Sequence, residues 1–377
     1  MKNYRQFNRA FFGLTIPGLL AVGLFNIGVD PYGVMNSPQW RLNRLRTEQF
    51  NHVRLFKASS VKRIAPKTVL LGSSRTDLGL DPKHPALEGG KPTYNLGLVG
   101  PNMYEVRRYF DHALANQPNL KTVVLGVDFF MFNEYKTNPA DFEEARLERD
   151  SLTPQEWLNV TLSLGVTRSS LGTIKNSWRS QANFLYHDNG FRYVHNNESY
   201  RPLPQEFENM IYGFFREEGY YPRFKLSQGF LNDFQELVEI CRSRNIDLHI
   251  FISPSHATQW EALRLAGHWD DFEQWKRELV AIAPVWDFSG YHYISSEPIS
   301  EEMAYYWDSS HYQQEVGNLI LNRLFDHDTA SVPPDFGVLM TPETIEPHLV
   351  QIRRDRESWA NANTEAIAFV EELKPEK

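Results

Sequence analysis

Four short apolar runs, each followed at once by small or polar residues, constrain the fold more than any other feature of the sequence. The runs are KTVLLGSS (67–74), TVVLGVD (122–128), IDLHIFISP (246–254) and APVWDFSG (283–290). Helix-like stretches follow or separate them at 102–116, 227–243, 257–282 (with an expected break near Gly267) and 312–325. Strand-like runs that alternate with helices predict an α/β fold, in which a parallel sheet is flanked by helices.

Length, charge and cysteine content narrow the class of protein. The chain has 377 residues, enough for one large α/β domain with insertions. Its net charge of −8 argues against a nucleic-acid partner, which would need a basic surface. The single cysteine, Cys241, excludes an intrachain disulfide and a cysteine-based zinc site. His187 and His195 flank a loop and could suggest a metal, but no carboxylate spacing supports one. We expect neither a metal ion nor another cofactor.

The N-terminal region contains an uncharged run of 20 residues, 10–29. At about 1.5 Å per residue a helix of this length spans about 30 Å, the thickness of a hydrocarbon core. The run is longer than the apolar region of a signal peptide and lacks a good cleavage site, so we expect an uncleaved transmembrane anchor over residues 1–30. Basic residues flank both ends almost equally, so the charge bias does not orient the anchor.

The rest of the chain divides into three expected parts. Residues 31–66 form a basic, membrane-proximal connector. Residues 67–326 form the α/β domain, interrupted at 129–226 by an aromatic-rich insertion that has no clear strand and is long enough to act as a lid. Residues 327–377 form a proline-containing linker and a charged helix.

Polar residues follow three of the four predicted strands. Ligands of open parallel sheets bind at the carboxyl ends of the strands, so these residues are candidates for a site. They are Ser73, Ser74 and Arg75 after the first strand, Asp128 after the second, and Ser253, Ser255 and His256 after the third. The loop NLGLVGPN (95–102) adds Gly100, whose backbone N–H could contact a ligand.

Three of the candidates together match the needs of a serine nucleophile. Such a serine requires a base, a group that orients the base, and N–H donors for the oxyanion. Ser74 is the candidate serine, His311 the base and Asp308 the orienting group, and Gly100 supplies a donor. Asp308 and His311 are three residues apart at a predicted helix start, so both can face one side. Three of these residues also have a structural alternative: a turn serine for Ser74, a helix N-cap for Asp308, and a turn glycine for Gly100.

These blocks resemble the SGNH (GDSL-like) hydrolase superfamily. The matching segments are Gly72-Ser73-Ser74, Gly100 within NLGLVGPN, LGVD (125–128) and Asp308-Ser309-Ser310-His311. The GSS form, the N-terminal anchor and DPYG (30–33) look more like the membrane-anchored branch, with its DltD-like and AlgJ- or AlgX-like acyltransferases. The resemblance implies a flavodoxin-like parallel sheet, Ser74 as nucleophile, His311 as base, Asp308 as its orienter, and an oxyanion held by the N–H groups of Ser74 and Gly100.

The resemblance also implies a biological setting. Such proteins act outside the cytoplasmic membrane beside a membrane-bound O-acyltransferase and move an acyl group, often acetyl, onto a cell-envelope polysaccharide. Two positions depart from the broad family pattern. Ser73 stands where the family has an aspartate, a change that the anchored branch often shares. Asp128 stands where the family has an asparagine that donates to the oxyanion. An ionised aspartate would repel that oxyanion, unless it pairs with Arg75 and shapes the site instead. Arg75 could equally be a surface charge.

Other functions fit parts of the same sequence. A periplasmic carbohydrate esterase would use the same three residues with water as acceptor. A non-catalytic scaffold or polymer-binding subunit would retain the fold without the chemistry. A carbohydrate-binding module would use exposed aromatic residues, for which the candidates are Tyr212, Phe214, Phe215, Tyr220 and Tyr221, although such residues are more often core. His256 could shape the site or simply be solvated at a helix N-terminus.

Overall fold

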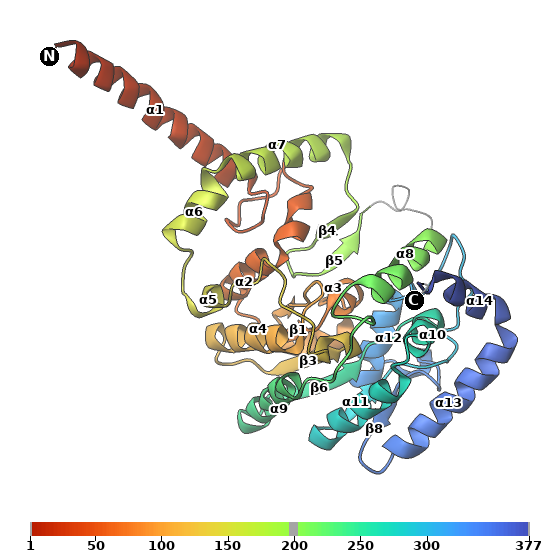
Figure 1. Cartoon of the computed structure of the whole chain (residues 1–377). Coiled ribbons are helices and arrows are strands. Elements are labelled where there is room, and N and C mark those ends of the chain that lie inside the picture. The colour runs from red at the N-terminus through yellow and green to blue at the C-terminus, as the bar shows by residue number, and fades with distance from the viewer. Residues whose placement is uncertain (1, 196–202, 376–377) are drawn as a thin grey trace. The chain divides into compact units, whose positions relative to one another are not determined.

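The computed structural model describes residues 2–195 and 203–375, and the chain forms two compact units (Figure 1). The first unit comprises Met1–Ser60, Glu143–His187 and Arg192–Ser199. The second comprises Val61–Phe142, Asp188–Phe191 and Tyr200–Lys377. All residues of the predicted catalytic set belong to the second unit.

The second unit is built on a six-stranded sheet with the order β2-β1-β3-β6-β7-β8. The first five strands are parallel, and β8 runs antiparallel to β7. The strands are β1 (Thr68–Leu71), β2 (Thr93–Asn95), β3 (Thr122–Val127), β6 (Asp247–Ile252), β7 (Val285–Asp287) and β8 (Val338–Met340). Each of the four predicted runs contains one of these strands, so the predicted α/β class with a mostly parallel sheet is confirmed.

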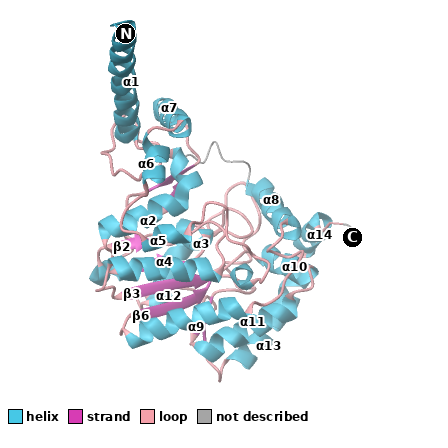
Figure 2. Cartoon of the chain, turned by 60° about the vertical axis from the view of Figure 1, so that its left-hand side comes forward, coloured by secondary structure: helices cyan, strands magenta, loops and turns pink. Residues whose placement is uncertain are grey.

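Helices cover both faces of this sheet (Figure 2). On one face α4 (Met103–Asn116), α9 (Gln228–Ser243), α11 (Trp269–Ile282) and α13 (Ile345–Ala362) pack in succession, and on the other α3 (Ser74–Gly79) packs against α12 (Gln314–Leu324). A third group consists of α8 (Leu203–Arg216), α10 (Ala257–Leu265) and α14 (Thr364–Leu373). The central strands β1 and β3 are buried almost throughout, which explains why their sequences are continuously apolar.

The helix predicted over 257–282 is broken near Gly267 into α10 and α11, as expected. Two short strands of the six-stranded sheet were not predicted. β2 and β8 have three residues each, too few for a periodic signal. The predicted linker and helix at 327–377 were therefore incomplete, because this tail adds β8 to the sheet edge, followed by α13 and α14.

The core between the sheet and α12 brings the C-terminal motif to the strands. Leu70, Val124 and Phe251 come from three adjacent strands and share this core with Tyr306 and Tyr312, all of them fully buried. The two tyrosines flank the segment that contains Asp308 and His311. Burial of two large aromatic side chains on either side of the motif fixes its position against the sheet.

The first unit contains the N-terminal helix and about half of the predicted insertion. Its helices are α1 (Lys2–Val29), α5 (Glu144–Glu148), α6 (Pro154–Thr161) and α7 (Leu164–Arg179), together with the start of α2 (Val53–Ile64). The segment 129–226 is thus divided between the units. It also contains an antiparallel strand pair, β4 (Phe184–Tyr186) and β5 (Arg192–Val194), where no clear strand was expected. Among the described residues, α1 is the one helix long and apolar enough to cross a membrane.

Candidate active site

The predicted nucleophile lies where the order of the parallel strands reverses. From β1 the chain goes to β2 on one side, and it then returns to β3 on the other side of β1. Ligands of such sheets bind beyond the carboxyl ends of the strands at this switch point. Ser74 follows β1 and Asp128 follows β3, so the topology brings these two predicted residues together.

The turn after β1 presents Ser74 at the start of a helix. Gly72 has φ +149, and a Cβ there would meet Thr76 and lie 2.8 Å from the carbonyl oxygen of Gly126, so only glycine fits. Ser73 is the N-cap of α3, and its Oγ accepts a hydrogen bond from the backbone N–H of Arg75 at 3.2 Å. Ser74 is therefore the first residue of α3, and its side chain is half-buried.

His311 joins Ser74 to Asp308. Its Nε2 lies 2.8 Å from Ser74 Oγ, and its Nδ1 lies 2.7 Å from Asp308 Oδ2. Because a carboxylate only accepts hydrogen bonds, Nδ1 carries the hydrogen and Nε2 is left to accept from the serine hydroxyl. The side chains of His311 and Asp308 are 15% and 8% exposed, so the imidazole is shielded but reachable.

The local structure that holds this pair differs from the one predicted. Asp308 and His311 lie in a loop, since α12 begins at Gln314 and its N-cap is Gln313. The prediction of a helix start and the alternative of an N-cap role for Asp308 are therefore wrong. Instead, Asp308 Oδ1 accepts from the backbone N–H groups of Ser310 and His311, at 2.7 and 2.8 Å. One carboxylate thus shapes the loop with one oxygen and orients the imidazole with the other.

A buried ion pair lies beside the nucleophile. Arg75 Nη1 donates to Asp128 Oδ1 at 2.7 Å, and Ser73 Oγ donates to the other carboxylate oxygen. The side chains of Arg75 and Asp128 are 5% and 0% exposed. The alternative of a surface charge for Arg75 is therefore wrong. The carboxylate of Asp128 is compensated by Arg75, as the pairing hypothesis required.

Ser310 connects this ion pair to the histidine loop, and the sequence had not marked it. Its Oγ accepts from Arg75 Nε at 3.1 Å and from Nη2 at 3.0 Å. The neighbouring Ser309 Oγ donates to Gln259 Oε1 at 2.7 Å. A serine inside Asp-Ser-Ser-His carries no signal of its own. Its position between the aspartate and histidine would have been the only clue.

His256 lies under the loop rather than at the nucleophile. It caps α10, with Nδ1 2.8 Å from Thr258 Oγ1 and Nε2 2.7 Å from the carbonyl oxygen of Glu297. Burial lowers its pKa to about 4, so the ring is neutral. Its backbone N–H donates to the carbonyl of Ser309 at 3.0 Å. The side chain is thus not the solvated one of the structural alternative, and its backbone supports the loop.

The glycine loop runs alongside the first strand turn. The backbone N–H of Leu98 donates to the carbonyl oxygen of Gly72 at 2.9 Å, and Gly100 has φ +58, which favours glycine. A Cβ on Gly100 would lie 3.5 Å from Tyr220 Oη and 3.8 Å from Lys136 Nζ. The ammonium of Lys136 is 3.8 Å from the centre of the Tyr220 ring. Lys136 had no sequence signal, and Tyr220 was considered only among the aromatics.

Tyr220 keeps its hydroxyl proton. Burial, together with the charge of Glu217, raises its pKa well above the ordinary value. Of the other aromatic candidates, Phe214, Phe215 and Tyr221 are buried in the core. Tyr212 is exposed, and the guanidinium of Arg216 lies 4.0 Å from its ring centre. The aromatic run therefore does not form a line of exposed rings.

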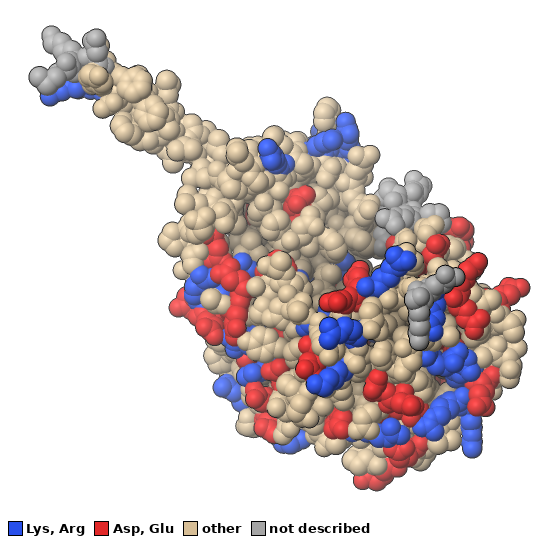
Figure 3. Space-filling model, viewed as in Figure 1, with Lys and Arg blue, Asp and Glu red and all other residues tan. Residues whose placement is uncertain are grey.

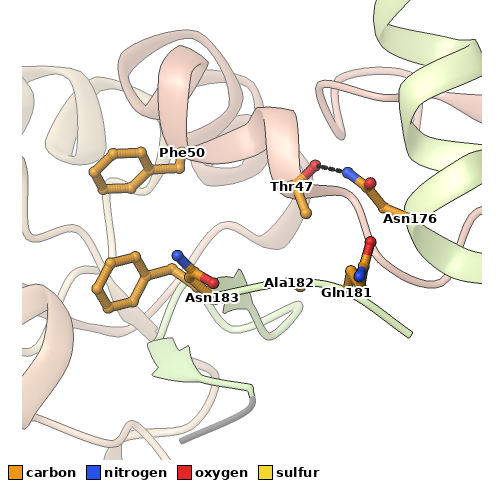
Figure 4. Close-up of a pocket in the computed structure, with 7 residues that line it drawn as sticks. Thr47, Phe50, Asn176, Gln181, Ala182 and Asn183 are labelled. Atoms are coloured by element: carbon orange, nitrogen blue, oxygen red, sulfur yellow. Dashed lines mark hydrogen bonds between the residues drawn. The ribbon is translucent and has the colours of Figure 1, made fainter. Parts of the chain in front are cut away.

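The first unit contains a separate cavity of about 640 Å³ (Figure 4). Its lining residues are Thr47, Phe50, Asn176, Gln181, Ala182, Asn183 and Phe184, none of them a predicted site residue. The rings of Phe50 and Phe184 stack with their centres 5.7 Å apart, and Asn176 donates to Thr47 Oγ1 at 3.1 Å. Across residues 2–195 and 203–375, no three His, Cys, Asp or Glu side chains come together as metal ligands.

The candidate site therefore combines a hydrogen-bonded Ser-His-Asp set, a compensated buried ion pair and a glycine loop at the switch point of a parallel sheet. A comparison of the sequence with protein-family models and with curated proteins finds no match.

Proposed function

We propose that this chain is a membrane-anchored, SGNH-like O-acyltransferase that works through an acyl-Ser74 intermediate. The observation that carries the proposal is the continuous hydrogen-bonded chain from Ser74 Oγ through His311 to Asp308. The five parallel strands have the order second, first, third, fourth, fifth, which is that of flavodoxin-like sheets and supports an SGNH-like fold.

The first half-reaction acylates the serine. Ser74 Oγ attacks the carbonyl carbon of an acyl donor while His311 Nε2 takes the hydroxyl proton, and Asp308 stabilises the imidazolium that forms. The N–H groups of Ser74 and Gly100 are the proposed donors to the oxyanion. When the tetrahedral intermediate collapses, the bond to the leaving group breaks and His311 returns the proton to that group.

The second half-reaction removes the acyl group. A hydroxyl of the acceptor loses its proton to His311 Nε2 and attacks the acyl-Ser74 carbonyl. The serine oxygen leaves and recovers the proton, so the enzyme is regenerated. The proposed acceptor is a cell-envelope or exported polysaccharide, and the proposed group is acetyl, both from the SGNH resemblance.

The compensated ion pair bears on the oxyanion. Asp128 would destabilise a nearby oxyanion if its charge were unopposed, but Arg75 and Ser73 both donate to it. We therefore assign Asp128 and Arg75 to positioning: they hold α3 and the histidine loop in register through Ser310.

The anchor sets the proposed location. Exposed apolar side chains cover α1 over most of its length, including Leu14, Leu19, Leu20 and Leu24. A helix with this surface is suited to hydrocarbon. We propose a single-pass protein of the cytoplasmic membrane, with the catalytic unit on the extracytoplasmic side next to a membrane-bound O-acyltransferase that supplies the acyl group.

An esterase that uses the same intermediate is the second candidate. It is favoured by the partial exposure of His311, which leaves the base reachable by water. The two functions differ only in the acceptor of the second half-reaction. The acylated protein would be trapped and then mixed with water alone or with acetyl-free polysaccharides. The rate at which the acyl group leaves Ser74 in each case shows which acceptor is preferred.

The test of the proposal is whether Ser74 reacts. The full chain in lipid nanodiscs would be treated with a fluorophosphonate or an activated acetyl ester and analysed by intact mass and peptide mapping. One adduct on Ser74 is expected, absent in Ser74→Ala and slower by roughly a thousandfold or more in His311→Gln. Ser73→Ala is the matched control, because it removes the adjacent serine but leaves the proposed nucleophile. A folded wild-type chain without an adduct would point instead to a scaffold.

A further inference from the structure

The helices α6 and α7 of the first unit carry large apolar side chains on their outer surface. On α7, Leu164, Leu171 and Trp178 are 77%, 58% and 80% exposed. Their spacing of seven residues puts them on one face of the helix. On α6, Trp157 and Leu158 are also exposed. A surface helix of a water-soluble protein normally packs such residues against the core.

The inward face of α7 has the opposite character. Its buried residues are Val166, Ser170, Thr173 and Ser177, which are small and mostly polar. Ser177 Oγ accepts from the backbone N–H of Leu45 at 3.0 Å, and the Ser177 carbonyl accepts from Arg44. α7 is therefore packed through its small polar face, and its large apolar face is left outward. That orientation fits surroundings less polar than water.

Basic residues alternate with the apolar ones along the same stripe. Arg168 and Lys175 are exposed, and the order along the face is Leu164, Arg168, Leu171, Lys175, Trp178. Between residues 157 and 187 the sequence has no Asp or Glu, although the whole chain has a net charge of −8. Figure 3 shows Lys and Arg side chains over α7. Apolar and basic residues on one helix face are typical of helices that lie in the headgroup region of a membrane.

The end of the exposed apolar part of α1 is attached to the junction of α6 and α7. Leu24 of α1 is exposed, whereas Asn26 and Val29 are buried within the unit. Asn26 Nδ2 donates to the carbonyl of Thr161 at 2.8 Å and to Thr167 Oγ1 at 3.0 Å. The point at which α1 stops being exposed is thus bonded to the junction of α6 and α7. In Figure 1 this end of α1 lies beside α6 and α7.

The loop after α1 adds two further exposed apolar side chains near the end of that helix. Trp40 and Leu42 are exposed. Asn43, which accepts from the backbone N–H of Trp40, donates to the carbonyl of Val29 at 3.2 Å. The loop is therefore folded back onto the end of α1. Tryptophan near the end of a membrane-spanning helix is expected for a membrane–water interface, where its ring is apolar and its N–H remains hydrated.

We propose that the outer face of α6 and α7, with Trp40 and Leu42, lies in the interface of the bilayer that α1 crosses, and that Arg168 and Lys175 bind anionic phospholipid headgroups. This inference rests on the proposed role of α1 as a membrane anchor. The first unit then contacts the membrane through its own surface as well as through α1.

The experiment reads the environment of position 171 in the full chain. Leu171→Cys would be labelled with the polarity-sensitive dye NBD in nanodiscs of phosphatidylcholine with or without phosphatidylglycerol. Wild-type chain, whose one cysteine is buried, controls for labelling. Val350→Cys is the matched variant, because Val350 is an exposed aliphatic residue on a helix of the second unit. Iodide quenches dye in water, and lipids with a doxyl group near the headgroup quench dye in the interface.

At position 171 we expect iodide quenching to fall at least roughly twofold below that at 350, with strong quenching by doxyl lipid. Adding phosphatidylglycerol should increase the protection of the dye from iodide. The double change Arg168→Gln and Lys175→Gln should remove that increase, because each basic residue is expected to strengthen partitioning into an anionic interface by about fivefold. Arg354→Gln, an exposed arginine on α13, should have no effect.

Iodide access at position 171 equal to that at position 350 would overturn the inference. Protection of position 171 in native membranes but not in nanodiscs would also overturn it, because that result would indicate a membrane-protein partner. Two readouts keep this result separate from the proposed function. Resistance of the chain to carbonate extraction reports on the anchor, and fluorophosphonate labelling of Ser74 reports on the chemistry. An extractable chain would overturn the anchor and the interfacial placement together.

Discussion

Replacing Asp308 with asparagine tests the proposed chemistry with the smallest change in shape. The introduced amide oxygen could still accept from the backbone N–H groups of Ser310 and His311, which now donate to Oδ1 of the aspartate at 2.7 and 2.8 Å. The loop should therefore keep its conformation. The other side-chain oxygen is replaced by an N–H donor, and this donor faces His311 Nδ1, which is now 2.7 Å from the carboxylate.

The expected effect follows from the tautomer of His311. Opposite an amide N–H, Nδ1 must accept, so the ring hydrogen moves to Nε2. Nε2 then cannot take the proton of Ser74 Oγ, which lies 2.8 Å away. In serine proteases the corresponding change lowers the rate by about 10⁴, equivalent to about 5.5 kcal/mol of transition-state stabilisation. We expect Asp308→Asn to slow acylation of Ser74 by a factor of about 10³ to 10⁴.

The assay is the second-order rate of Ser74 acylation by an activated acetyl ester, followed by mass spectrometry under excess ester. Asp81→Asn is the matched control. Asp81 likewise accepts a backbone N–H, that of Lys83, and a side-chain donor, Gln314, but lies outside the proposed set. This control should change the rate by less than about threefold, which is within about 0.7 kcal/mol.

A folded Asp308→Asn chain that acylates within about tenfold of wild type would refute the reasoning, since tenfold is only about 1.4 kcal/mol. In that case His311 would not act as the base through Nε2. A variant that loses its fold would be uninformative by itself, so the thermal midpoint of each chain is measured first. The retained contacts of the amide oxygen are the reason to expect a midpoint close to that of wild type.

Three further predictions concern the surroundings of the site. Arg75→Ala leaves the carboxylate of Asp128 buried and unpaired, so it should destabilise the chain by about 3–5 kcal/mol in urea unfolding. Asp128→Asn added to it should recover a large part, whereas additive losses would contradict their pairing. Gly317→Ala places a Cβ against the carbonyl oxygen of Gly79 and should push α12 away from α3. We expect it to lower the free energy of unfolding by about 1–3 kcal/mol and to slow acylation of Ser74; an unchanged rate would show that the packing of these two helices does not position the site. Burial lowers the pKa of the His256 imidazole from 6.5 to about 4. Between these pH values the unfolded chain binds a proton that the folded chain does not. The contribution of His256 to the free energy of unfolding is therefore complete above pH 6.5 and decreases by about 3 kcal/mol as the pH falls to about 4. His256→Asn, which retains an N-cap acceptor, should flatten this slope in urea unfolding at several pH values, and an unchanged slope would mean that other groups cause it.

The motifs of the second unit were readable because local rules govern them. A run such as TVLL followed by Gly72 is apolar on both faces, so it predicts a covered parallel strand whatever its neighbours are. The same run placed Ser74 at a carboxyl end. Asp308 and His311 were paired by a helical spacing, but the structure brings them together in a loop before α12. That His311 reaches Ser74 is a property of the tertiary structure, since 237 residues separate the two atoms that lie 2.8 Å apart.

Other features depended on partners that a sequence does not reveal. β8 is a strand because its three residues pair with the edge of β7, and nothing in Val338–Met340 itself requires a strand. Asp128 could be recognised as a departure from the family pattern, but its effect depended on whether a counter-charge was near. The 2.7 Å contact with Arg75 decided that question, because the influence of a buried charge depends on the charges within a few ångströms of it.

The sequence by itself determined the apolar N-terminal helix, four strands of the sheet with helices that follow them, and the residue types of the proposed site, because each depends on neighbours within one or two turns of chain. Only the tertiary structure decided which face of α7 points outward, that Ser310 bridges Arg75 to the histidine loop, and that Lys136 and Tyr220 lie beside Gly100. These outcomes depend on contacts between residues far apart in the chain, and such contacts form only when the whole core packs.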